Sequence, residues 1–251
     1  MTTDRVFFEN IYAKWNKPEY IHPDPLEFIG KYENAADKET VGFIAACMAY
    51  GNVTQILAHL ETALSPLGDR PADFLKNAAD SELKNIYASF RYRFTDGEQL
   101  SLFMTDIKYA LISAGSLENM FKAGDDGDIT VKNALKKFLR AFNSHGRAVS
   151  LTPDPELDSS FKRVNLFLRW MVRKDNVDPG IWRGIPTSRL IVPLDTHMRQ
   201  TAISLGMTVR KDTGMKTALE ITEFFRKINP EDPIKYDFSL TRSGIRGNNP
   251  V

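Results

Sequence analysis

Apolar side chains recur at helical spacing along nearly the whole chain, and this pattern restricts the fold more than any other feature. Near the start, Phe7, Ile11 and Trp15 fall at every fourth position, which places them on one face of a helix. The sequence holds no convincing alternation of apolar and polar residues. The nearest is "RLIVPL" (189–194), which is short and ends at Pro193. The sequence therefore predicts an all-α fold.

Capping residues and chain breakers divide this pattern into separate helices. "TDGE" (95–98) has the Thr-x-x-Glu spacing of a capping box and opens one helix, and Thr130 is placed to cap another. The polar stretch 144–160 is the best candidate for a linker. The predicted helices cover residues 4–16, 36–50, 53–64, 95–114, 130–142, 161–174, 196–205, 213–227 and 233–243.

The composition is ordinary for a globular protein outside the secretory route. Among the 251 residues is a single cysteine, Cys47, which excludes an intrachain disulfide and any iron–sulfur or zinc site built on several cysteines. The four histidines lack metal-ligand spacing, so we expect no metal and no cofactor. The N-terminus lacks the plain apolar run of a signal peptide, and no segment approaches the length of a membrane span. We expect a cytoplasmic monomer that does not bind membranes.

Positive charge is concentrated in one segment, although the net charge of the whole chain is only +1. Residues 161–200 contain eight Lys or Arg and three Asp. Such a segment suits a phosphate backbone, because each neutralised phosphate releases counterions. The alternative is an ordinary solvated helix face, on which Lys162, Arg169 and Arg173 share one side. The charge count alone leaves both interpretations open.

The segment "VPLDTHM" (192–198) raises the clearest question about chemistry, because Asp195 stands at its centre. Pro193 precedes this aspartate and a helical pattern follows it, so the carboxylate is placed to accept hydrogen bonds from the free amides of a first turn. A plain helix cap explains this placement. The same placement also holds a carboxylate rigid and ionised, which suits a residue that must face a developing positive charge.

The string "IVPLDTHMRQTAISLGM" (191–207) resembles the signature of the helix-hairpin-helix DNA glycosylases. In that superfamily the aspartate of the string is catalytic, and it matches Asp195. The whole chain is also similar to an uncharacterised bacterial family related to the archaeal 8-oxoguanine DNA glycosylases. Three further segments resemble parts of the same fold more loosely: the helix–turn–helix 39–64, the aromatic-basic segment 90–103 and the closing helix 236–245.

The resemblance implies a lysine nucleophile, and two lysines compete for this role. The usual hairpin of the superfamily reads Leu-Pro-Gly-x-Gly followed by Lys. This chain has "DPGIWRGIP" (178–186) instead, and no lysine lies at the usual distance before Asp195. In the archaeal branch, whose hairpin is also atypical, the nucleophile lies near the start of the first helix of the hairpin. Lys162 sits at nearly that distance, with one extra residue, and Lys174 is the second choice.

The resemblance further implies the activity, the substrate and the architecture. A bifunctional glycosylase and AP lyase would act on an oxidised purine such as 8-oxoguanine in double-stranded DNA, without a cofactor. Lys162 would attack C1′ as a neutral amine, and Asp195 would stabilise the charge on the sugar or deprotonate the nucleophile. Two helical lobes with a cleft between them are implied: residues 1–36 with 158–251, which bear the hairpin, and residues 37–157, which include the linker.

Contacts with DNA are implied for the turn of the helix–turn–helix, for the aromatic-basic segment and for the basic segment. The candidates are Tyr50, Asn52, Arg91, Arg93, Arg169, Arg183, His197 and Arg199. Tyr50, Trp170 or Trp182 would stack on the flipped base or fill the gap that it leaves. Two other functions stay open: a DNA-binding protein that keeps the fold without turnover, and an unrelated all-α interaction protein in which Asp195 is only a cap.

Overall fold

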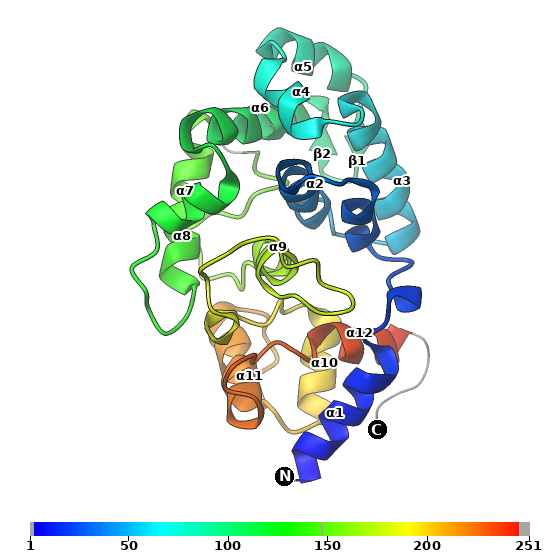
Figure 1. The fold of residues 1–251 in the computed structure, drawn as a ribbon, viewed down its shortest axis with the longest axis vertical. Helices are drawn as coiled ribbons and strands as arrows, with labels where there is room; N and C mark the ends of the chain where they lie inside the picture. The colour runs from blue at the N-terminus through cyan, green and yellow to red at the C-terminus, as the bar shows by residue number, and fades with distance from the viewer. Residues whose placement is uncertain (1–2, 147, 246–251) are drawn as a thin grey trace. The chain divides into compact units, whose positions relative to one another are not determined.

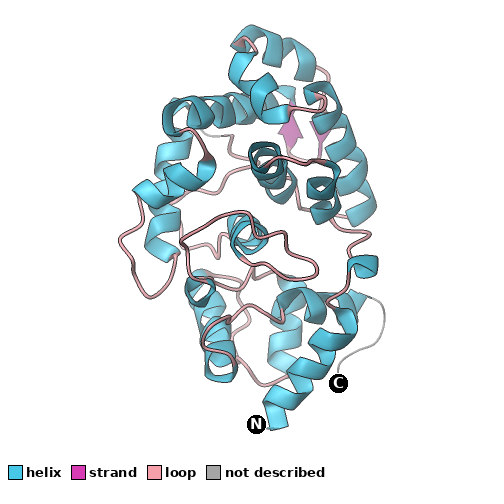
Figure 2. Ribbon diagram, viewed as in Figure 1, coloured by secondary structure: helices cyan, strands magenta, loops and turns pink. Residues whose placement is uncertain are grey.

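The computed structural model describes residues 3–146 and 148–245, and most of them are helical (Figures 1 and 2). The predicted all-α class is confirmed, with one small exception. A β-hairpin of two residues a strand pairs β1 (Arg91–Tyr92) with β2 (Thr95–Asp96). Both ends of the chain, residues 1–2 and 246–251, lie outside the described residues, as does Arg147 of the predicted linker. No described helix has the length and apolar character needed to cross a membrane.

The chain divides into two compact units. Unit 1 comprises residues 1–22, 127–131 and 158–251, and unit 2 comprises residues 23–126 and 132–157. The first division falls after His22 rather than after residue 36, because the 3₁₀ helix η2 (Pro25–Lys31) packs against α2 (Ala35–Cys47) within unit 2.

Unit 1 is held together by an aromatic core. The ring centroid of Phe8, on the first helix, lies 5.3 Å from those of both Phe225 and Tyr236. Residues near 130 join this unit because the amide of Val131 donates to the carbonyl of Arg189 over 3.0 Å. The helical elements are α1 (Thr3–Trp15), η1 (Pro18–Tyr20), α9 (Lys162–Val172), η5 (Thr187–Arg189), α10 (Thr196–Ser204), α11 (Met215–Ile228) and α12 (Asp237–Ile245).

Unit 2 is built around α2, whose residues from Thr40 to Cys47 are all buried. Phe43 packs its ring 5.5 Å from that of Phe103. The buried carboxylate of Glu39 is satisfied because it accepts hydrogen bonds from the amides of Leu117 and Glu118 at 2.9 and 2.8 Å. The other helical elements are α3 (Val53–Leu64), η3 (Ser65–Leu67), α4 (Pro71–Asn77), α5 (Asp80–Tyr87), α6 (Gly97–Ala114), α7 (Leu117–Ala123), α8 (Lys132–Phe142) and η4 (Asn143–His145).

One predicted helix cap and the predicted linker differ from the structure. The cap of α6 is Asp96, whose Oδ1 accepts from the amide of Gln99 at 2.9 Å, and not Thr95. Thr95 belongs instead to strand β2, and its hydroxyl donates to Ser150 over 2.7 Å. The stretch 144–160 is not a free linker, because several of its side chains are fully buried, among them Leu151.

Candidate functional site

Asp195 caps the first turn of α10 and also lies next to a lysine. Its Oδ1 accepts a hydrogen bond from the amide of Met198 at 2.9 Å, and its Oδ2 lies 3.8 Å from Nζ of Lys162, the first residue of α9. This separation is too long for a hydrogen bond, so the lysine nitrogen is not bonded directly to the carboxylate. The Lys162 and Asp195 side chains are 29% and 35% exposed. A ligand from solvent can therefore reach both groups.

The backbone directly before Lys162 is strained. Phe161, the N-cap residue of α9, has a φ of +49°, a left-handed conformation that costs a bulky residue on the order of 1–2 kcal/mol. Its side chain is buried, and its carbonyl accepts the first helical hydrogen bond from the amide of Asn165 at 2.9 Å. Packing therefore enforces a conformation that fixes where α9, and with it Lys162, begins.

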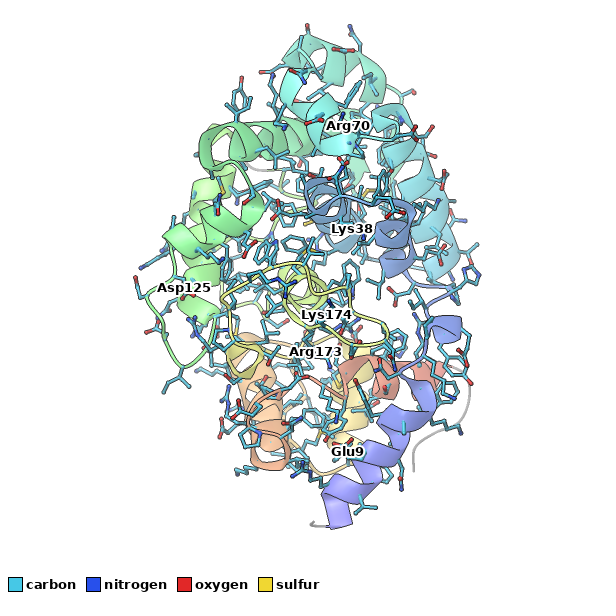
Figure 3. The ribbon with its side chains drawn as sticks, in the orientation of Figure 1. Glu9, Lys38, Arg70, Asp125, Arg173 and Lys174 are labelled. Carbon is cyan, nitrogen blue, oxygen red and sulfur yellow. The ribbon has the colours of Figure 1, made fainter. Side chains whose placement is uncertain are left out.

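Lys174, the second candidate nucleophile, is labelled in Figure 3 and follows Val172, the last residue of α9, by two positions. It is exposed and pairs through its backbone with Pro179. Since α9 has 11 residues, roughly 16 Å of helix separates the backbones of Lys162 and Lys174. The ion pair of Asp195 is formed with Lys162.

Arg169, on α9, is buried within unit 1. Its Nε lies 3.2 Å from Oδ1 of Asp178, and its Nη1 lies 2.5 Å from Oδ2 of Asp237. Only 3% of the arginine is exposed. Its charge is thus matched by carboxylates inside the protein, in contrast to the predicted contact with a DNA phosphate.

Arg173, one turn further along α9, is enclosed in the same way. It pairs with Asp178, and its Nη2 lies 2.9 Å from Asp175 and 3.0 Å from Asp232. These carboxylates raise the pKa of the Arg173 guanidinium, against the opposing effect of burial. The excess of basic residues in 161–200 is therefore smaller at the surface than in the sequence, because two of the arginines are neutralised internally.

The remaining candidates of the basic segment lie nearer the surface. Arg183 is exposed in the loop after α9, and His197 is exposed in the first turn of α10. Arg199 is half-buried, and its guanidinium donates to the carbonyl of Lys211. These three residues and Lys162 belong to unit 1.

In unit 2, the turn between α2 and α3 packs against the β-hairpin. Asn52 caps α3 by accepting from the amide of Thr54 at 3.0 Å. The ring of Tyr50 lies 4.9 Å from that of Tyr92, whose hydroxyl donates to the carbonyl of Tyr50. Gly51 has a φ of +99°, and a Cβ there would lie 2.8 Å from a guanidinium nitrogen of Arg93. A residue without a side chain is therefore required for this packing.

A pocket of about 290 Å³ opens beside this turn. Three of its residues were not among the candidates from the sequence: Gln55, Tyr92 and His59, whose ring stacks on that of Tyr92 with the centroids 4.4 Å apart. Arginines and side-chain amides of this kind suit a phosphate or the polar edge of a base. The residues lining the pocket are Asn52, Gln55, His59, Arg91, Tyr92 and Arg93.

The hairpin presents an exposed aromatic residue that the sequence prediction missed. Arg93 and Phe94 form its two-residue turn; Arg93 has a φ of +52°, and 77% of Phe94 is exposed. The guanidinium of Arg93 lies 5.4 Å from the ring of Phe94. The alternation Phe-Arg-Tyr-Arg-Phe at 90–94 was the available signal, since it has the period of a strand.

Two aromatic residues considered for base stacking occupy the core instead. Trp170 is fully buried and Trp182 is 4% exposed, with the latter ring packed 5.2 Å from that of Phe167. Of the described non-glycine residues, Arg93 and Phe161 are those with a positive φ. One lies beside the pocket of unit 2 and the other directly before Lys162. Strain of this kind clusters at functional sites.

The described residues contain no group of three or more His, Cys, Asp or Glu arranged to hold a metal ion. Residues 24–246 match the model of a family described as "Protein of unknown function (DUF2400)". The chain belongs to the DUF2400 family. The match spans most of this DUF2400 protein, including Lys162, Asp195 and the pocket of unit 2. Comparison with curated proteins and with solved structures gives no match.

Proposed function

We propose that the protein is a DNA glycosylase with an associated AP lyase activity, acting on an oxidised purine such as 8-oxoguanine. The observation that carries the proposal is the 3.8 Å separation between Lys162 Nζ and Asp195 Oδ2. The resemblance to the helix-hairpin-helix DNA glycosylases assigns the same two residues as nucleophile and catalytic carboxylate. The two-lobed arrangement with a cleft between the lobes, which that resemblance implies, stays part of this proposal.

The proposed chemistry proceeds in two stages. The neutral amine of Lys162 attacks C1′ of the flipped nucleotide, the bond from C1′ to the base nitrogen breaks, and the base leaves with a proton. The sugar ring then opens to an imine between C1′ and Nζ. Loss of a proton from C2′ expels the 3′ phosphate and breaks the strand. Asp195, held by its hydrogen bond at the helix end, stabilises the positive charge on the sugar.

Exposed residues of both units would contact the DNA. In unit 2, the pocket beside Arg91 and Arg93 offers cations and amides to the backbone and to base edges. Phe94 offers an accessible aromatic ring that is suited to stacking on bases. In unit 1, Arg183 and His197 are exposed on the same unit as the Lys162–Asp195 pair.

Borohydride trapping tests this function directly, because the reagent reduces the imine to a stable amine that links protein and DNA. We would incubate the wild type with duplexes carrying 8-oxoguanine, uracil or an abasic site. The expected result is a trapped adduct on the 8-oxoguanine duplex, absent for Lys162→Ala and retained for Lys174→Ala. Lys174 is a matched control, because it follows the C-terminal end of the same helix and no ion pair with a carboxylate is seen for it among the described residues.

The other outcomes separate the alternatives. Tight, salt-dependent DNA binding without an adduct on any duplex would replace the enzyme by a DNA-binding protein that keeps the fold. Loss of both binding and trapping would leave Asp195 as a helix cap. An adduct that persists in Lys162→Ala and disappears in Lys174→Ala would assign the nucleophile to the other end of α9.

A further inference from the structure

A buried hydrogen bond joins the two segments that precede Lys162 and Asp195. Ser160 stands two residues before Lys162, and its hydroxyl donates to the carbonyl oxygen of Leu194 over 3.3 Å. Leu194 is the residue directly before Asp195. Ser160 is 5% exposed and Leu194 is 1% exposed, so water does not compete for this bond. One side chain therefore bridges the two stretches of backbone that carry the candidate catalytic pair.

A buried asparagine on α9 holds Ser160 from the other side. Asn165 donates twice to the backbone before Lys162: its Nδ2 to the carbonyl of Ser160 over 2.8 Å, and its main-chain amide to the carbonyl of Phe161. The Oδ1 of Asn165 is buried and has no hydrogen-bond partner among the described residues. An unpaired buried acceptor costs free energy, so packing alone does not explain an asparagine here. What its side chain contributes is the bond to Ser160.

The segment that accepts the bond from Ser160 is itself anchored. Residues 190–194 are all buried, and the amide of Val192 donates to the hydroxyl of Thr222, on α11, over 3.0 Å. Directly after this segment, the carbonyl of Asp195 accepts the first helical bond of α10 from the amide of Arg199 at 2.9 Å. The bond from Ser160 therefore ties the start of α9 to a fixed support at the start of α10.

We propose that Ser160 and Asn165 are positioning residues that hold the starts of α9 and α10 together, and so fix where Lys162 lies relative to Asp195. The two bonds, from Asn165 Nδ2 to the Ser160 carbonyl and from Ser160 Oγ to the Leu194 carbonyl, form what we call the serine link. The inference rests on the proposed function of Lys162 as the nucleophile. Neither positioning residue touches the reacting atoms. Their effect is geometric, because a displacement of about 1 Å at a reacting group can slow a reaction by roughly 100-fold.

Trapping under single-turnover conditions on the 8-oxoguanine duplex measures the effect of the serine link on the reaction. We expect Ser160→Ala to slow adduct formation at saturating duplex by about 10-fold. The dissociation constant of the duplex should stay within about two-fold of the wild type, because the buried hydroxyl does not contact DNA. Ser160→Thr keeps the hydroxyl and should restore the rate. An unchanged rate, or a loss confined to the dissociation constant, would overturn the proposal.

Asn165→Leu breaks the other half of the serine link. It should slow adduct formation about as much as Ser160→Ala does, and the double variant should be no slower than the slower single variant, because both substitutions break one link. Effects that multiply in the double variant would contradict a single link.

Ser239→Ala is the matched control for the lost hydroxyl. Ser239 is a fully buried serine of unit 1, and its hydroxyl has no hydrogen-bond partner among the described residues. The same substitution at this position removes a buried hydroxyl without breaking a bond to the segment before Asp195. We expect the wild-type rate of adduct formation. A rate as slow as that of Ser160→Ala would overturn the proposal, since any buried hydroxyl would then serve.

Hydrogen exchange followed by nuclear magnetic resonance tests the serine link without DNA. The amides of Asn165 and Arg199 make the first helical bonds of α9 and α10. In Ser160→Ala both amides should exchange about 10-fold faster, whereas amides in the middle of α9 and in unit 2 should keep the wild-type rate. A general loss of stability would instead accelerate all of them. Unchanged exchange of the two amides would overturn the proposal.

The two measurements separate this inference from the proposed function. An adduct that forms equally fast in the wild type and in Ser160→Ala overturns the inference alone. No adduct with the wild type, together with faster exchange confined to the two helix starts, overturns only the proposed function and upholds the link between α9 and α10. Circular dichroism first shows that each variant is folded. If Asn165→Leu does not fold, the comparison of Ser160→Ala with Ser239→Ala still decides.

Discussion

At the scale of single residues, Asp195 combines two roles that one substitution separates. Asparagine caps a helix about as well as aspartate, so we expect Asp195→Asn to change the free energy of unfolding by less than about 0.5 kcal/mol. The loss of the carboxylate charge should slow adduct formation on an 8-oxoguanine duplex by about 100-fold or more. Urea denaturation and trapping rates measure the two effects.

The alanine variant at the same position is the control for the cap. Asp195→Ala should lose about 1 kcal/mol of stability, because the amide of Met198 loses its acceptor. An asparagine variant that forms the adduct at the wild-type rate would reduce Asp195 to a structural role. The same pair of substitutions therefore distinguishes the helix cap from the catalytic carboxylate.

Asp106 on α6 should make stability depend on pH. It is 1% exposed, neither carboxylate oxygen has a hydrogen-bond partner among the described residues, and burial raises its pKa to about 7. The folded state holds the proton more tightly than the unfolded chain. The stabilisation that the folded state gains by keeping Asp106 protonated is therefore present at pH 4 and is lost as the pH rises to about 7.

We expect Asp106→Asn to remove this dependence. Relative to the variant, the wild type should lose roughly 4 kcal/mol of unfolding free energy between pH 4 and pH 8. Urea denaturation at both pH values measures the difference, and Asp69→Asn at an exposed site serves as the control. Parallel pH dependences for wild type and Asp106→Asn would show that Asp106 does not titrate in this range.

At the scale of elements, the turn that follows α9 depends on a glycine for two reasons. Gly180 has a φ of +55°, and a Cβ there would lie 2.4 Å from Cβ of Lys174 and 2.6 Å from the carbonyl oxygen of Arg173. Its amide also donates to the carbonyl of Trp170 over 3.1 Å. An added methyl group would therefore disturb the end of the helix that carries Lys162.

Gly180→Ala should destabilise the protein by roughly 3 kcal/mol, the sum of backbone strain and a clash that the fixed backbone cannot relieve. Gly206→Ala is the matched control, because Gly206 has a similar φ of +68° but open space around it. It should cost only about 1 kcal/mol. Equal unfolding free energies for the two variants, measured in urea, would contradict the close packing of this turn.

The β-hairpin offers a test of DNA contact that leaves the fold untouched. Phe94 is 77% exposed, so Phe94→Ala should change stability by less than about 0.5 kcal/mol. If its ring stacks on bases, the affinity for duplex DNA should fall by about 1–3 kcal/mol. Fluorescence anisotropy measures this loss. Ile112→Ala on α6, 55% exposed in the same unit, should leave the affinity unchanged.

The sequence predicted helices correctly where the signal came from residues close together along the chain. The helix 53–64 matches α3 residue for residue, because Asn52 and the apolar stripe define it together. The short helices α4, α5 and α7 were not predicted, because each has only 7 or 8 residues and too few turns to show a clear period. The β-hairpin was also missed, because its strands have two residues each and the alternation at 90–94 that marks it is correspondingly short.

At the scale of the whole molecule, the sequence did not predict which charged side chains from distant segments pair with one another. The charge count of residues 161–200 indicated a basic surface, but Asp232 and Asp237 lie outside that window and neutralise Arg173 and Arg169 from later in the chain. The Lys162–Asp195 pair was reached through resemblance. Helical periodicity alone places both residues at helix starts but does not bring them together.

This internal neutralisation changes the salt dependence expected of DNA binding. Each phosphate that a protein neutralises makes the slope of log K against log salt steeper by about 0.9. If Arg91, Arg93, Arg183 and Arg199 each bind a phosphate, the slope should be about −3.6. The buried Arg169 and Arg173 would contribute nothing, because their charges are matched inside unit 1.

Substitutions in each unit test whether both bind the same DNA. Arg91→Gln in unit 2 and Arg183→Gln in unit 1 should each make the slope shallower by about 0.9, and the double variant by about 1.8. Arg70→Gln, at an exposed arginine paired with Asp73 on α4, should leave it unchanged (Figure 3). A slope that responds to Arg91 but not to Arg183 would confine DNA binding to unit 2. The Lys162–Asp195 pair would then belong to a unit for which no DNA binding is demonstrated. That result would contradict the proposed glycosylase activity.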